Sequence, residues 1–136
     1  MPNESHNTFL RNAILIDAAA SAAMGVMMAA AAIPLSGLLG LPEELLRICG
    51  LALLPYAAIL GLAGTRPAIN LNIVLAVIAG NVAWVIASGV LLVSGWVSPT
   101  ALGLGFVILQ ALAVLGFAEL QIIGYRRRKQ PLAMMA

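Results

Sequence analysis

The stretch "INLNIVLAVIAGNVAWVIASGVLLV", residues 69–93, decides the fold class of this chain. It contains no charged side chain over 25 residues, and a helix needs about 20 apolar residues to cross the hydrocarbon core of a bilayer. Backbone groups inside lipid must find hydrogen-bond partners within their own segment, so a single span of this kind is a helix and not a strand. The stretch therefore predicts a transmembrane helix.

Three further segments of the same character flank this one. They cover about residues 9–33, 43–63 and 99–125, with short connections that contain proline and glycine. Because short connections make consecutive helices antiparallel neighbours, we predict an all-α fold, an integral membrane four-helix bundle with up-down-up-down topology. Residues 1–136 are expected to form a single membrane domain that ends in a basic cytoplasmic tail, residues 126–136.

The composition excludes most other classes of protein. Hydrophobic residues make up 62% of the chain and charged residues 9%, whereas soluble domains carry about 25% charged residues. One cysteine, Cys49, and one histidine, His6, cannot form an intramolecular disulfide or a cysteine- or histidine-rich metal site. The chain also lacks the common catalytic and phosphate-binding motifs. We therefore expect no enzyme activity, no cofactor and no metal.

The basic residues predict an orientation. Arg47 lies on one side of the predicted membrane, and the other side carries Arg11, Arg66, Arg126, Arg127, Arg128 and Lys129. This bias is typical of cytoplasmic loops, so we predict a multi-pass protein of the bacterial inner membrane with both termini in the cytoplasm. Residues 126–129 would form a basic anchor at the anionic lipid surface. Since topology explains the basic residues, we expect membrane lipids and no nucleic acid as partners.

Small residues are concentrated in the first apolar segment, which reads "DAAASAAMGVMMAAAA" over residues 17–32. Small side chains allow transmembrane helices to approach closely and to associate. Such positions include the pairs Ser21–Gly25 and Ala57–Gly61, and also Gly103 and Gly105. They predict a tight bundle. The leading function is accordingly non-enzymatic: the helix faces would associate with a second copy or with a larger membrane complex.

Two acidic residues lie at membrane depth. Asp17 follows Arg11 by six residues and Glu119 precedes Arg126 by seven, or about 9 and 10 Å along a helix axis. Both carboxylates are therefore predicted at one level, in the cytoplasmic half of the bilayer. Acids at this depth usually face a bundle interior or a wet cavity.

Other polar residues share helix faces with these acids. Ser21 lies one turn from Asp17, and the last helix places Gln110 and Gln121 on one face with Glu119 nearly opposite Gln110. In the third segment, helical spacing puts Asn70, Asn81, Trp84 and Ser88 on one stripe. The candidate intramembrane polar site comprises Asp17, Ser21, Asn81, Trp84, Ser88 and Glu119.

Three interpretations of this site remain open. The polar groups could serve only to hydrogen-bond the helices to one another. Asp17 and Glu119 could instead form a protonatable pair in a small transporter or proton-coupled carrier. In the third interpretation, the polar stripe binds a lipid, a quinone or a pigment.

Four sequence fragments resemble a known type of protein: "RNAILIDAAAS" (11–21), "NVAWVIAS" (81–88), "GWVSPTALG" (95–103) and "FAELQ" (117–121). With the basic tail, they resemble small four-helix integral membrane proteins of bacteria. The resemblance implies the architecture and no site roles. In size and topology the chain is also similar to the small multidrug resistance exporters, with Asp17 in place of their first-helix glutamate, although the residues around Asp17 differ from their pattern.

Overall fold

The computed structural model describes the backbone of residues 2–135 and the side chains of residues 8–128. The described chain is all-α, as predicted. Its helices are α1 (Pro2–Ala30), α2 (Ala32–Leu39), α3 (Glu43–Thr65), α4 (Leu71–Val93) and α5 (Ala101–Met135).

Four helical segments are long and apolar enough to cross a membrane. They are Thr8–Ala30, Glu43–Thr65, Leu71–Val93 and Ala101–Arg128. At most 33% of the residues in the apolar window of each segment are buried within the chain, and large apolar side chains such as Leu109 remain 68% exposed. A surface of this kind needs lipid around it. The chain is a multi-pass membrane protein with four spans.

The first connection differs from the predicted pattern. The first helix ends at Ala30 and not near residue 33, and a fifth helix, α2, follows it. Pro34 explains the break, because it has no N–H for the carbonyl of Ala30 but is tolerated in the first turn of a new helix. Helix α2 ends at Gly40, whose φ of 69° lies in the left-handed region that favours glycine. At the other end of the chain, α5 continues to Met135, so residues 126–135 extend a helix and do not form a separate tail.

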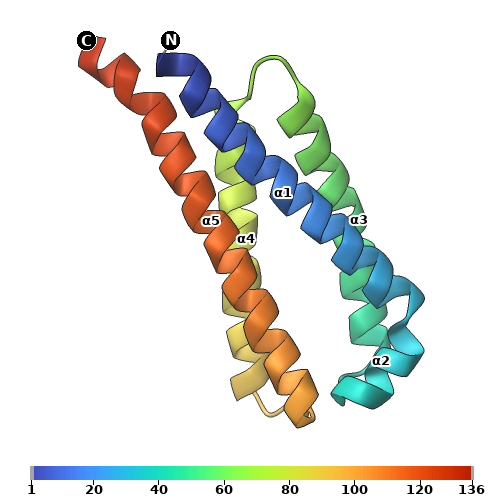
Figure 1. Ribbon diagram of the computed structural model, residues 1–136. Helices are drawn as coiled ribbons and strands as arrows, with labels where there is room; N and C mark the ends of the chain where they lie inside the picture. Colours follow the sequence, from blue (N-terminus) through green and yellow to red (C-terminus); the bar gives the residue numbers. More distant parts are fainter. Residues whose placement is uncertain (1, 136) are drawn as a thin grey trace.

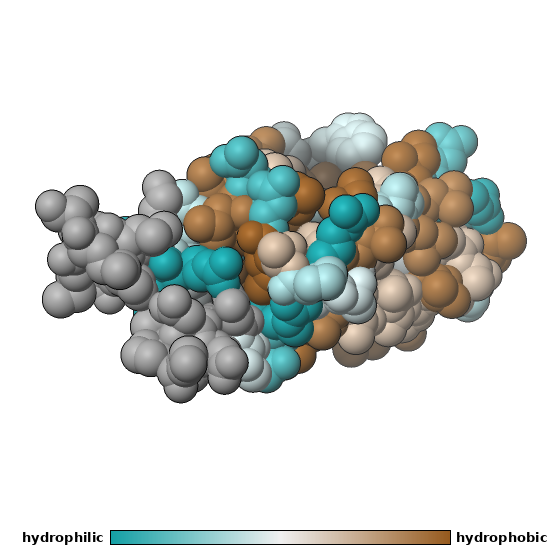
Figure 2. Space-filling view, turned by 90° about the horizontal axis from the view of Figure 1, so that it is seen from above, coloured by the Kyte–Doolittle hydropathy of each residue, from teal (hydrophilic) through white to brown (hydrophobic). Residues whose placement is uncertain are grey.

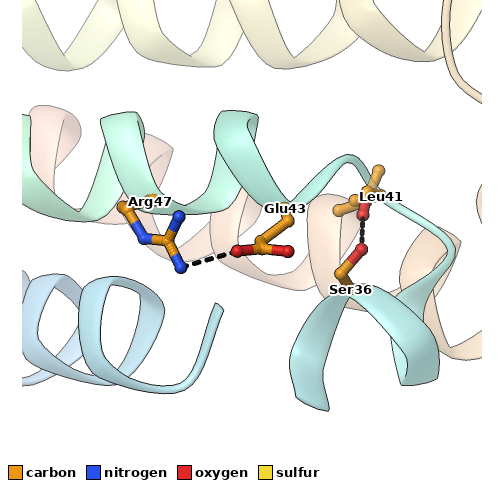
Figure 3. A network of polar contacts seen from close by, with 4 residues as sticks. All are labelled: Ser36, Leu41, Glu43 and Arg47. Atoms are coloured by element: carbon orange, nitrogen blue, oxygen red, sulfur yellow. Dashed lines mark hydrogen bonds and ion pairs between the residues drawn. The ribbon is translucent and has the colours of Figure 1, made fainter. Parts of the chain in front are cut away.

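Side-chain contacts fix the turn between α2 and α3 (Figure 3). The Ser36 hydroxyl donates to the carbonyl of Leu41 at 2.6 Å. One turn into α3, Arg47 pairs with Glu43 at 2.7 Å. Because this pair is exposed, its contribution to stability is small.

The four spans are packed unevenly (Figure 1). Helix α1 packs along α3 and also contacts α5, while α4 packs on α5. Helices α3 and α4 have hardly any close backbone contact, although they are consecutive. Both ends of the chain and the α3–α4 connection lie at one end of the bundle. Figure 2 views the molecule from that end, where hydrophilic side chains gather near the centre and hydrophobic ones cover most of the flanks.

Glycines allow the closest helix contacts. A Cβ atom on Gly50 would lie 2.6 Å from the nitrogen of Ala29 and 2.8 Å from the carbonyl oxygen of Gly25. Here the α1 and α3 backbones touch, so Gly25 mediates the close approach predicted for the first helix. Gly103 similarly lies against the carbonyl of Leu39. In contrast, Gly61 and Gly105 have no such neighbour within 4 Å.

These contacts predict different effects of the same substitution at two glycines of α3. We expect Gly50→Ala to lower the free energy of unfolding by about 1–3 kcal/mol, because the new methyl group meets backbone atoms that cannot move aside. Gly61→Ala should be neutral or stabilise the protein by up to about 1 kcal/mol, since alanine favours helix. Unfolding in mixed micelles by added dodecyl sulfate, followed by circular dichroism, measures both. Equal effects at the two positions would contradict this account of the α1–α3 contact.

Candidate functional site

Asp17 is the centre of a buried hydrogen-bond network. Its side chain, on α1, is 1% exposed. The Ser21 hydroxyl donates to Asp17 Oδ1 at 3.1 Å. Two amide groups donate to Asp17 Oδ2: Asn81 Nδ2 of α4 at 2.8 Å and Gln121 Nε2 of α5 at 2.7 Å. One carboxylate thus joins three of the four spans.

Tyr56 connects the remaining span, α3. Its hydroxyl donates to Asn81 Oδ1 at 2.7 Å, and Asn81 Nδ2 also donates to Gln121 Oε1 at 2.9 Å. Asn81 therefore accepts from α3 through its carbonyl oxygen and donates to α1 and α5 through its amide nitrogen. The network links all four spans at one level.

The donors around Asp17 are neutral. Two N–H groups converge on Oδ2, which suits an ionised carboxylate because a proton on that oxygen would face them. Arg11, on the same helix, is occupied elsewhere: its guanidinium donates to the carbonyls of Gly64, Arg66 and Pro67 at the end of α3. Among the described residues, the ion pair formed is Glu43–Arg47. The charge of Asp17 is thus balanced by dipoles and by no cationic side chain.

A second polar cluster joins α4 to α5. Trp84 Nε1 donates to Gln110 Oε1 at 2.6 Å. Gln110 Nε2 donates to Ser88 Oγ and to the carbonyl of Val107, each at 3.0 Å, and the Ser88 hydroxyl donates to the carbonyl of Trp84 at 2.8 Å. These groups satisfy one another.

A cavity of about 260 Å³ lies beside both networks. Asp17 and Ser21 contribute to its wall, together with Trp84, Ser88 and Gln110. The rest of the wall is apolar and includes Met24, Met28, Leu45, Leu91, Phe106 and Phe117. In the part of the chain with described side chains, no group of three or more His, Cys, Asp or Glu residues is placed to hold a metal ion.

A smaller cavity, about 200 Å³, lies where α3 and α4 are separated. Its wall includes Tyr56 of α3 and Gly80 and Asn81 of α4. Ser21 and Trp84 line both cavities. The two spaces are therefore neighbours.

The structure brings together most of the residues selected from the sequence. Asp17, Ser21 and Asn81 lie in the first network, and Trp84 and Ser88 in the second. Glu119 is not brought to Asp17: it is exposed on α5. Gln121 takes that place instead and is fully buried. Positions 119 and 121 lie about 200° apart around the helix, so Glu119 faces outward when Gln121 faces inward.

Three residues that complete the site, Gln110, Gln121 and Tyr56, were not among the selected residues. The helical arithmetic had put Gln110 and Gln121 on one face of the last span, and that signal correctly indicates which glutamines face inward. Tyr56 gives a weaker signal. It follows Pro55, which removes one backbone hydrogen bond from α3 and thereby favours a local bend.

Comparisons with protein-family models, with curated proteins and with solved structures give no match.

The network predicts unequal effects of leucine at two nearby positions of α5. Gln121→Leu removes a donor from the Asp17 carboxylate, and we expect it to lower the free energy of unfolding by about 1–3 kcal/mol, the range for an under-satisfied buried group. Glu119→Leu replaces an exposed acid on a helix that is otherwise apolar, so stability should stay the same or rise. Dodecyl sulfate unfolding compares the two variants. Greater destabilisation by Glu119→Leu would show that Glu119, and not Gln121, supports the bundle.

Proposed function

We propose that this protein is a small proton-coupled carrier of the bacterial inner membrane, with its ligand site in the larger cavity and Asp17 as the coupling group. One observation supports this most: a buried carboxylate without a cationic partner among the described residues lies on the wall of an apolar cavity. Acids at membrane depth typically mark ion or substrate pathways. Glu119, which is exposed on α5, has no part in this mechanism.

Proton binding at Asp17 would change the packing of the spans. The ionised Oδ2 atom accepts hydrogen bonds from α4 and α5, and a proton on the carboxyl group weakens or rearranges them. Asn81 carries the change to Tyr56 on α3. The protonation state of the carboxylate thus affects a hydrogen-bond network shared by all four spans. Such a network can have two alternative packings. A ligand that binds the same carboxylate competes with the proton for it. This competition is the minimum requirement for exchanging ligand for proton across the membrane.

The α3–α4 gap provides the path for a ligand dissolved in the bilayer. The smaller cavity lies at this gap, where Gly80 has no side chain and Tyr56 reaches across to Asn81. A ligand that displaces Tyr56 would reach the Asp17 network directly. Lateral access also avoids a water-filled pore, which this mostly apolar cavity would not support.

We propose that both termini face the cytoplasm. Arg11, Arg66 and residues 126–128 lie toward the end of the bundle that carries the chain ends, and Arg47 lies toward the other. This distribution supports the orientation through the positive-inside bias. Asp17 would then lie in the cytoplasmic half of the membrane.

Proton movement in reconstituted vesicles tests the carrier. We expect a panel of small amphipathic cations, neutral compounds and anions to include at least one that changes the internal pH of vesicles containing the wild-type protein. Asp17→Asn should abolish this change, because an amide side chain does not bind and release protons at the pH of the experiment. The variant should still fold, since the asparagine oxygen can accept from Asn81 and Gln121 while its nitrogen faces Ser21.

Glu119→Gln is the matched control, because it removes an exposed acid from the same half of the bundle. It should move protons as the wild type does. Proton movement that persists in Asp17→Asn, or its absence with every compound class in the wild type, contradicts the proposal.

A second candidate function is association with another copy or with a larger membrane complex. It is supported by a stripe of small, exposed residues along one face of α4: Ala76, Gly80, Ala83 and Ala87. Small residues at this spacing allow close contact between transmembrane helices. A partner on this face would lie beside the α3–α4 gap.

Disulfide cross-linking in native membranes tests self-association. In a Cys49→Ser background, we expect Ala83→Cys to give a dimer on mild oxidation, and Leu112→Cys, an exposed position of α5, to give none. Two copies that pack through α4 would bring their Ala83 positions together, whereas Leu112 on α5 would lie away from that interface. Dimers formed equally by both variants would indicate random collision and would contradict a specific α4 interface.

A further inference from the structure

We infer that the ligand of the larger cavity is a compact amphipathic monocation, with an ammonium group at Asp17 Oδ1 and one apolar body. This inference rests on the proposed function as far as transport is concerned. The binding itself follows from the charges and hydrogen bonds of the site.

The sign of the ligand charge follows from the wall of the cavity. Asp17 is the one carboxylate on that wall, which carries no lysine, arginine or histidine; the other titratable group there is the Cys49 thiol. An anionic ligand would meet a like charge in a medium that screens poorly. A neutral ligand would leave the charge balanced by dipoles alone. A cation supplies the counter-charge that Asp17 lacks among the described residues.

The hydrogen bonds identify the oxygen atom that would meet this cation. Asp17 Oδ2 already accepts two amide N–H groups. Asp17 Oδ1 accepts one hydrogen bond, from the Ser21 hydroxyl, and both residues contribute to the cavity wall. Oδ1 therefore retains acceptor capacity. An ammonium group with at least one N–H can donate to Oδ1, and a second N–H can use the oxygen of Ser21.

The remaining wall restricts the body of the ligand. Trp84, Ser88 and Gln110 hydrogen-bond to one another, so a second polar group on the ligand would find few partners. Apolar side chains, including Phe106 and Phe117, form most of the rest. A polyamine is disfavoured, because the wall has one carboxylate. The volume, about 260 Å³, lies just below the roughly 300–1,000 Å³ of sites for drug-sized ligands, so the body is small, such as a phenylalkyl group.

Three probes with one body and different charges test this inference. They are 4-phenylbutylammonium, 4-phenylbutanol and 4-phenylbutyrate, titrated into the full chain in lipid nanodiscs. A Trp96→Phe background leaves Trp84, on the cavity wall, as the sole tryptophan reporter. Empty nanodiscs correct for partition into lipid. We expect saturable binding of the ammonium compound at least tenfold tighter than that of the alcohol or the acid.

Two variants separate the charge from the space. Asp17→Asn should weaken binding of the ammonium compound at least tenfold, and Glu119→Gln should leave it unchanged. Ala113→Leu adds bulk to the cavity wall while Asp17 remains, and it should also weaken binding. Circular dichroism verifies that each variant keeps its helices.

The outcomes distinguish this inference from the carrier proposal. Binding of the alcohol or the acid as tightly as the ammonium compound, or full affinity in Asp17→Asn, overturns the inference even if vesicles containing the protein move protons. Selective binding of the cation without proton movement supports the inference and contradicts the carrier.

Discussion

The need to satisfy one carboxylate inside lipid constrains the whole bundle. Asp17 is buried, so the chain must supply donors at fixed distances, and these come from α1, α4 and α5. Each donor fixes the rotation of its helix about its own axis. Tyr56 extends the same requirement to α3 through Asn81. The apolar faces of the spans provide no comparable directionality, because lipid tails compete equally well for leucine and valine.

The closest helix contacts and the cavities lie in different parts of the bundle. Gly25 and Gly50 bring α1 and α3 into backbone contact, and small residues on α1 leave little bulk between the spans. The same lack of bulk leaves a cavity where α3 and α4 diverge. The second polar cluster, around Gln110, holds α4 and α5 together without using the carboxylate. Helices α4 and α5 are therefore also joined independently of the Asp17 network.

The sequence predicts the spans well, because lipid leaves helices as the only solution for long apolar segments. It also identifies the face of α5 that carries Gln110 and Gln121, both of which hydrogen-bond to other spans. It does not reveal which face of α5 points inward: Gln121 and not Glu119 meets Asp17, and that rotation depends on contacts with three other helices. Tyr56 is only weakly indicated, by its position after Pro55, since its role depends on how far α3 lies from α4. The extra helix α2 follows from Pro34, a local feature whose outcome depends on the turn after it.

A purely structural role does not explain a carboxylate at this position. Asparagine could accept the same two amide hydrogen bonds through its oxygen and face Ser21 through its nitrogen, with no charge to hold at membrane depth. A charged side chain at the centre of a transmembrane helix costs about 2.5–3.5 kcal/mol on insertion scales. What the carboxylate adds is a negative charge and an exchangeable proton. Asp17 also lies on the wall of a mostly apolar cavity, and this combination is the reason for proposing binding coupled to proton exchange in addition to helix packing.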